Sequence, residues 1–164
     1  MHDIYKLSPP VVEIIKPLAQ IELEQVNFYM QLGAIANGLG FLGAEKYFYN
    51  ESNEEKEHYM GWQNYLLGRG NEVIVPMVDE QPMIKVKSLY ELTEKALAME
   101  ASVSTMYQNA ATQAFGLCQM TYRKIQEYIL IQQEALAFYI DACTTLAKLD
   151  KGGELVAEKK IFKV

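Results

Sequence analysis

Three glutamates and one histidine stand where helical periodicity predicts buried side chains. Glu22, Glu55 and Glu100 each interrupt a stripe of apolar residues that recurs at steps of three and four, and His58 follows Glu55 by three residues. Side chains at that spacing lie on one face of a helix. Three carboxylates and one imidazole form an oxygen-rich donor set, which suits iron or manganese better than soft metals. The pattern predicts a metal site inside a helical protein.

Further polar residues lie on the same inward stripes. Gln132 is the strongly polar member of the last stripe, where its amide either joins the metal ligands or completes a hydrogen-bond network. For Tyr29 and Glu51 two interpretations stay open. Each belongs to the metal site, or Tyr29 only packs in the core and Glu51 is only a solvated surface charge. Glu134 is a candidate for an accessory outer metal position.

Four long segments carry the helical period and would position these side chains. They are predicted at Pro10–Asn37, Leu42–Arg69, Lys87–Phe115 and Leu117–Lys148, with glycine or proline between them. Short turns at residues 38–40 and at Gly116 predict two antiparallel hairpins, and residues 70–86 form a long extended connection. We therefore expect one all-α domain over residues 1–164, a four-helix bundle with a single long crossover. A short helical tail, residues 154–164, is too small to stand alone and should pack on something.

The candidate ligands also fall at one height in such a bundle. Glu22 lies 17 residues before Leu39 and Glu55 lies 16 after it, whereas Glu100 and Gln132 lie 16 residues before and after Gly116. At ~1.5 Å rise per residue, each is ~24–26 Å from its own turn. Burying several carboxylates in one layer is unfavourable unless protons or cations compensate them. Cations are the natural compensation.

Composition narrows the function classes. The chain has 164 residues, of which 50% are hydrophobic and 22% charged, as is usual for a folded globular domain. Its 15 Lys and Arg against 21 Asp and Glu give a net charge of −6, so nucleic acid and anionic membranes are unsuitable partners. The start lacks the features of a signal peptide and no apolar stretch approaches ~18 residues, so a cytoplasmic location is expected. Cys118 and Cys143 have no CxxC spacing and are predicted to be reduced thiols.

The helical segments resemble those of ferritins. The run Asn53 to His58 is similar to the second-helix signature of that family, and Glu22 followed by Tyr29 looks like its first-helix pair. Glu100 and Gln132 fall where the third-helix Glu and fourth-helix Gln are expected. The resemblance covers nearly the whole chain, including the crossover and the tail.

This resemblance implies a specific activity. Glu22, Glu55 and His58 would hold one iron, and Glu55, Glu100 and Gln132 the second, so each chain would bind two ions that both contact Glu55. Tyr29 would lie beside the pair and hydrogen-bond or donate an electron. Fe(II) would be oxidised by dioxygen or hydrogen peroxide and stored as ferric mineral inside a homo-oligomeric shell of 24 chains. Apolar residues of the tail, with too few neighbours in one bundle, also favour assembly.

Some positions depart from the family pattern. Ile131 stands where many ferritins have Glu, which weakens the case for a third iron position. Ala135 replaces the His of a second E-x-x-H, so the chain is unlike bacterioferritin and no haem is expected. No acidic pair of the kind that lines animal ferritin channels occurs near Tyr122 and Ile125. Two alternatives stay open, namely a non-catalytic shell subunit that only nucleates mineral, and a diiron or dimanganese oxidoreductase acting on another substrate.

Overall fold

The computed structural model describes residues 5–163 and consists of helices joined by turns and one extended connection. No strand occurs among these residues. The helices are α1 (Pro9–Leu39), α2 (Leu42–Gly68), α3 (Leu89–Phe115), α4 (Gln119–Leu146) and α5 (Lys151–Ile161). The predicted all-α class is confirmed, and each long helix begins and ends within two residues of its predicted bounds.

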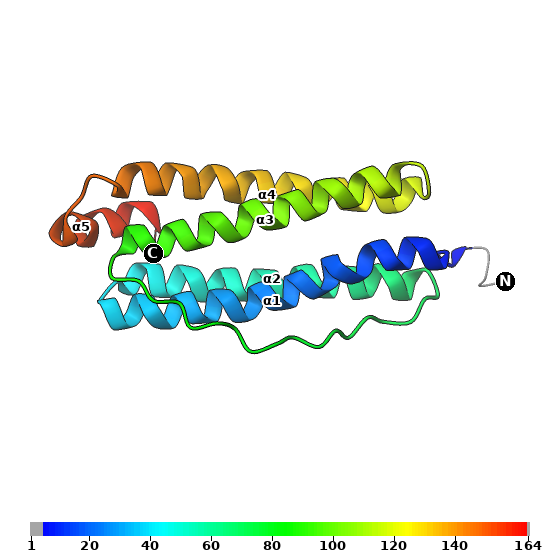
Figure 1. Ribbon diagram of the computed structural model, residues 1–164, viewed down its shortest axis with the longest axis horizontal. Coiled ribbons are helices and arrows are strands. Elements are labelled where there is room, and N and C mark those ends of the chain that lie inside the picture. Colours follow the sequence, from blue (N-terminus) through cyan, green and yellow to red (C-terminus); the bar gives the residue numbers. More distant parts are fainter. Residues whose placement is uncertain (1–4, 164) are drawn as a thin grey trace.

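The four long helices form two antiparallel hairpins, α1 with α2 and α3 with α4, which lie side by side (Figure 1). Gly40 permits the tight first turn, because its φ of 89° is in the left-handed region that favours glycine. Helices α2 and α3 run in the same direction, so the chain must return along the full length of the bundle between them (Figure 1). The topology is the predicted bundle with one long crossover.

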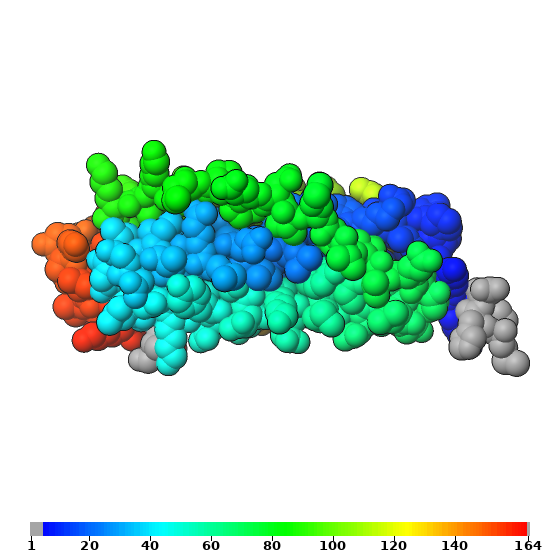
Figure 2. Space-filling view, turned by 90° about the horizontal axis from the view of Figure 1, so that it is seen from below, coloured from blue at the N-terminus to red at the C-terminus, as the bar shows by residue number. Residues whose placement is uncertain are grey.

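The crossover lies on the surface of the α1 and α2 hairpin (Figure 2). Two glutamine side chains fix it by replacing the backbone partners it lacks. Gln63 accepts from Ile74 N at 2.9 Å and donates to Ile74 O at 2.6 Å, and Gln31 accepts from Ile84 N at 2.8 Å. Extended backbone with few neighbours is thus satisfied by amide side chains.

The short C-terminal helix differs from its prediction. Helix α5 begins at Lys151 and includes both Gly152 and Gly153, whereas the sequence suggested a helix only after them. The Asp150 side chain caps it by accepting from Gly153 N at 2.8 Å. The apolar tail was expected to need another chain to cover it, but Phe162 is already buried against aromatic rings of its own bundle. Val156 is 66% exposed.

Two buried carboxylates of α5 bind the beginnings of other helices. Glu154 accepts from Leu89 N at 3.1 Å and Tyr90 N at 2.9 Å, at the start of α3. Glu158 accepts from Gly43 N at 3.1 Å and Ala44 N at 3.3 Å, at the start of α2. These amides have no partner within their own helices, and a helix N-terminus attracts negative charge. The two glutamates are therefore structural, and they explain how α5 closes one end of the bundle.

The core consists of two apolar clusters separated by a polar layer. One cluster is built around Ile15, Leu18, Trp62 and Leu66, and the other around Leu32, Phe48, Leu92 and Tyr139. None of the helices within residues 5–163 has the length and apolarity needed to cross a membrane. Both cysteines are free thiols, as expected.

Candidate metal centre

The polar layer between the two apolar clusters contains a buried candidate ligand from each long helix, and α2 adds His58 as a second. Glu22 is 0% exposed, Glu55 4%, Glu100 1% and Gln132 1%. Nearly equal counts of 16 or 17 residues from the two hairpin turns place them at a similar height, as the sequence predicted. Few globular cores bury three carboxylates together without a compensating positive charge.

Glu22, Glu55 and His58 form the compact half of the layer. His58 Nδ1 lies 2.9 Å from Glu55 Oε2 and 3.4 Å from Glu22 Oε2. One ligand atom from each residue lies within 4.8 Å of the others, a spacing at which all three can contact one metal ion.

Protonation balances charge in this layer. Burial alone would lower the pKa of His58, but the adjacent carboxylates of Glu22 and Glu55 raise it to about 10 through their polar contacts with the ring and their negative charges. Burial raises the pKa of Glu55 to about 8, and the hydrogen bond to His58 opposes part of that rise. Burial and the charge of Glu55 raise the pKa of Glu100 to about 7. Protons therefore occupy this layer at neutral pH, and a cation would displace them.

The other half of the layer opens into a pocket of about 250 Å³. Glu55, Glu100 and Gln132 line it, together with Glu51 from α2 and Ala135 from α4. Burial, followed by the charges of Glu54, Glu55 and Glu100, raises the pKa of Glu51 to about 8. Glu54 and Glu134 also line the pocket, but both are exposed at its rim.

Three of the candidate ligands each have a buried oxygen without a hydrogen-bond partner among the described residues. They are Glu22 Oε2, Glu100 Oε2 and Gln132 Oε1, and Gln25 Oε1, on the side chain that donates to Glu100, also lacks one. A buried acceptor left without a partner costs about 1–3 kcal/mol, and more when it is charged. A cation held between these oxygens would remove that cost, so the residues present fit a metal.

Each of two ligands is held by a tyrosine from the antiparallel helix. Tyr29 OH donates to Glu100 Oε1, which also accepts from Gln25 Nε2 at 3.0 Å. Tyr107 OH donates to Glu22 Oε1. Burial and the neighbouring carboxylate raise the pKa of each phenol well above its usual value, so both remain donors. One oxygen of each carboxylate is thereby fixed while the other stays available.

Gln25 and Tyr107 also belong to the site, although neither is among the residues predicted from the sequence. A signal for Tyr107 was present, because Tyr29 follows Glu22 by seven residues and Tyr107 follows Glu100 by the same interval. Since α1 and α3 are antiparallel neighbours, this repeated spacing places each tyrosine against the other helix's glutamate. Gln25 lies three residues after Glu22, whereas the predicted inward stripe of the first helix continues four residues after Glu22, at Val26.

An aromatic stack extends from Tyr107. Trp62 Nε1 donates to Tyr107 OH at 2.9 Å, and the Trp62 and Tyr128 rings stack at 5.0 Å between centroids. Tyr128 OH donates to the backbone oxygen of His58 at 2.7 Å. The stack therefore supports both Glu22 and the helix segment that carries the imidazole.

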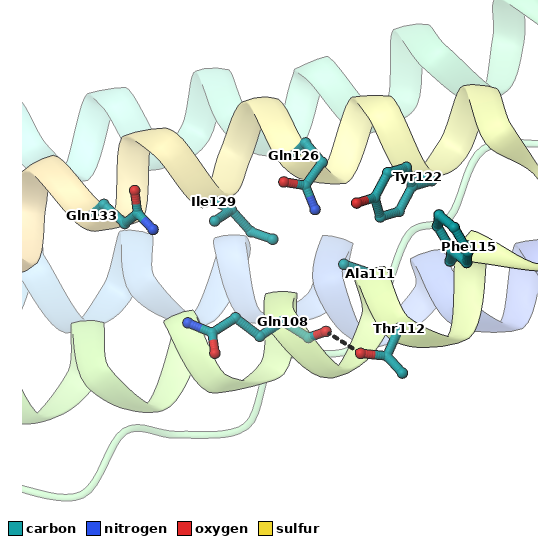
Figure 3. A pocket seen from close by; sticks show the side chains of 8 residues that line it. All are labelled: Gln108, Ala111, Thr112, Phe115, Tyr122, Gln126, Ile129 and Gln133. Carbon is teal, nitrogen blue, oxygen red and sulfur yellow. Dashed lines mark hydrogen bonds between the residues drawn. The ribbon is translucent and has the colours of Figure 1, made fainter.

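A separate hollow of about 470 Å³ lies between α3 and α4 near their turn (Figure 3). Its lining includes Gln108, Gln126 and Gln133, with the rings of Phe115 and Tyr122. None of the described side chains that line it is a carboxylate, imidazole or thiol. It lacks strong metal donors, and the polar layer is the candidate metal centre.

Comparison with known proteins gives concordant results. A model of the ferritin-like domain matches residues 13–149. A curated relative, a probable bacterial non-heme ferritin-like protein of Haemophilus influenzae, is 27% identical over 99 residues. That match spans 60% of this chain and 59% of the relative, less than two thirds of its length.

Solved structures share the fold. An open pore ferritin of the archaeon Archaeoglobus fulgidus superposes with a TM-score of 0.88 at 22% identity, covering 96% of this chain and 98% of the other. An engineered closed form of the same ferritin also gives 0.88, at 21% identity over 96% and 97% of the two chains. Because the family model covers most of the bundle and the polar layer, this chain belongs to the ferritin family of iron-binding proteins.

Proposed function

We propose that this protein oxidises Fe(II) at a pair of metal positions in the polar layer and stores the ferric product inside a shell of identical chains. The three buried oxygens without hydrogen-bond partners carry this proposal. A layer built only for stability would pair these atoms or replace them with apolar groups. Oxygens held unpaired beside an imidazole are suited to a cation that enters and leaves.

Each residue of the layer has a proposed role. Glu22, Glu55 and His58 hold the first iron, while Glu55, Glu100 and Gln132 hold the second. Glu55 bridges the two, since a shared carboxylate reduces repulsion between adjacent cations. Tyr29 orients Glu100 and lies beside the pair as a hydrogen-bond donor or a source of one electron.

Two adjacent irons match the electron requirement of the oxidant. Each Fe(II) gives one electron, so the pair supplies the two that convert dioxygen, with two protons, to hydrogen peroxide. The same two electrons and two protons convert hydrogen peroxide to two water molecules. Protons displaced from Glu55, Glu100 and His58 when iron binds are a nearby supply.

Storage requires an enclosed volume, which we propose is a shell of 24 chains. Large apolar side chains are exposed on several helices, including Leu42 at 63%, Leu67 at 57%, Leu130 at 62% and Ile140 at 51%. In a shell of identical chains such residues would be buried between copies. Sedimentation of the native protein should give a monodisperse large particle, and a monodisperse monomer would contradict the shell.

Aerobic loading with Fe(II) tests the activity and the storage together. We expect rapid appearance of ferric absorbance and many irons per particle, far above two per chain. Glu55→Gln should lose the rapid phase, while Glu57→Gln, an exposed change of the same kind on the same helix, should keep it. Mineral formed at equal rates by parent and Glu55→Gln would favour a shell that only nucleates mineral. Two tightly held ions with no mineral would favour a soluble dimetal oxidoreductase.

A further inference from the structure

Glu51 lies one helical turn before Glu55 on α2 and is not among the ligands proposed above. The four-residue spacing places both carboxylates on one side of the helix. Glu51 lines the same pocket as Glu55, Glu100 and Gln132. It is half-buried, whereas the two rim glutamates are exposed.

The pocket has independent signs of a missing cation. Glu100 Oε2 and Gln132 Oε1 belong to side chains only 1% exposed, both line the pocket, and neither atom has a hydrogen-bond partner among the described residues. Among the described residues that line this pocket, His58 is the only one able to carry positive charge. Unpaired buried oxygens of this kind seek a positively charged ligand.

The fourth helix contributes no buried charge here. Gln132 is neutral, Ala135, which lines the pocket one turn later, has no donor atom, and Glu134 lines the pocket but is exposed. With Glu22, Glu55 and Glu100 alone, three negative charges face the four positive charges of two divalent ions. A fourth carboxylate would make the layer neutral, and buried charge is tolerated best when it is balanced.

We propose that Glu51 is a ligand of the second metal position, where it supplies the carboxylate that α4 lacks at Ala135. This rests on the two-metal function proposed above. The second position is then built mainly by α2 and α3.

Anaerobic binding measurements with Co(II) and Fe(II) on the assembled protein test the assignment without using turnover. The parent should bind two ions per chain. Glu51→Gln should keep the first at parent affinity and bind the second at least about tenfold more weakly. Glu57→Gln should bind both like the parent. Adding Ala135→Glu to Glu51→Gln should restore the second ion, because the carboxylate then comes from α4.

Crystals soaked with Co(II) provide a direct check, in which the second ion should contact a Glu51 oxygen. Two ions bound by Glu51→Gln at parent affinity, or a second ion distant from Glu51, would overturn this inference and leave the two-metal function intact. A parent that binds only one ion per chain would instead refute the proposed function, and the inference with it.

Discussion

At the scale of single residues, Glu22 and Glu100 each have one carboxylate oxygen held by a tyrosine and a second oxygen without a hydrogen bond. Tyr29 and Gln25 hold one oxygen of Glu100, and Tyr107 holds one oxygen of Glu22. A carboxylate fixed in this way loses little rotamer freedom when it binds a cation, so less of the binding free energy is spent on ordering it. The tyrosines thus prepare the ligands without occupying the atoms that bind metal.

Replacing Glu100 by Gln should separate stability from metal binding. The amide keeps shape and can still accept from Tyr29, while the loss of one negative charge relieves repulsion from Glu55. We expect the metal-free variant at pH 8 to be unchanged or about 1–3 kcal/mol more stable than the parent. Rapid Fe(II) oxidation should be largely lost. Calorimetry of the metal-free protein and stopped-flow absorbance after mixing with Fe(II) in air measure the two effects. A variant that melts well below the parent would show that Glu100 is structural.

Replacing Tyr107 by Phe should have the opposite effect on stability. Glu22 Oε1 and Trp62 Nε1 would both lose a buried partner. We expect the metal-free protein to lose about 1–3 kcal/mol in urea unfolding. The matched control is Tyr90→Phe, which removes a hydroxyl bonded to Glu94 at the exposed surface and should change stability by less than about 0.5 kcal/mol. Equal losses in the two variants would argue against a buried anchoring role.

The sequence predicted the acidic residues of the layer better than their supports. A charged residue on an apolar stripe is conspicuous, so Glu22, Glu55 and Glu100 could be found from periodicity alone. A tyrosine on the same stripe is apolar for most of its area, so apart from the repeated seven-residue spacing it looks like core packing. The role of Tyr107 depends on where its hydroxyl ends, which is set by the antiparallel packing of α1 against α3.

At the scale of elements, glycine and proline residues between the long helices predict where those helices begin and end. They do not predict where α5 begins. Its start is determined by the Asp150 cap and by contacts of Glu154 and Glu158 with distant helix ends. Two glycines in the first turn of a short helix argue against helix by propensity alone. Tertiary contacts override that propensity, and such contacts are not visible in a local pattern.

Glu154→Gln tests whether α5 stabilises the bundle through helix capping. A single amide oxygen cannot accept well from both Leu89 N and Tyr90 N, and the negative charge at the α3 N-terminus is lost. We expect a loss of about 1–2 kcal/mol in the free energy of unfolding. Glu57→Gln should melt at the parent temperature. An unchanged melting temperature for Glu154→Gln would show that the capping contacts contribute nothing measurable.

At the scale of the whole molecule, a charged layer divides an otherwise apolar core into two halves. The metal-free bundle therefore depends on protons to neutralise its centre. The folded-state pKa of Glu55 is about 8 and that of Glu100 about 7, against a usual 4.5. Between pH 4.5 and these raised values, the folded protein therefore binds more protons than the unfolded chain. Stability from these groups is present at low pH and falls as pH rises through this window. The raised pKa of His58 acts in the same direction, with its contribution lost as pH rises through about 10.

This linkage predicts an unusual pH profile for the metal-free protein. Each extra proton held in the folded state gives a slope of ~1.4 kcal/mol per pH unit. We expect the parent to lose stability relative to Glu100→Gln as pH rises from 5 to 8, because the variant lacks one of the titrating groups. Calorimetry with a chelator present measures the difference. A difference that stays constant with pH would refute the assigned role of Glu100 in proton uptake.

The chain contains one tryptophan, and its indole is two hydrogen bonds from a proposed metal ligand. Trp62 donates to Tyr107, which donates to Glu22. Binding of an ion at the first metal position, which Glu22 helps to form, should therefore alter the polarity around the indole. Its fluorescence should therefore serve as a built-in optical reporter of the first position alone. Titration of the metal-free protein with Zn(II), which does not absorb the emitted light, should shift the emission up to one equivalent per chain and little afterwards. In Tyr107→Phe the shift should be much smaller, and equal shifts in both proteins would show that the indole senses something else.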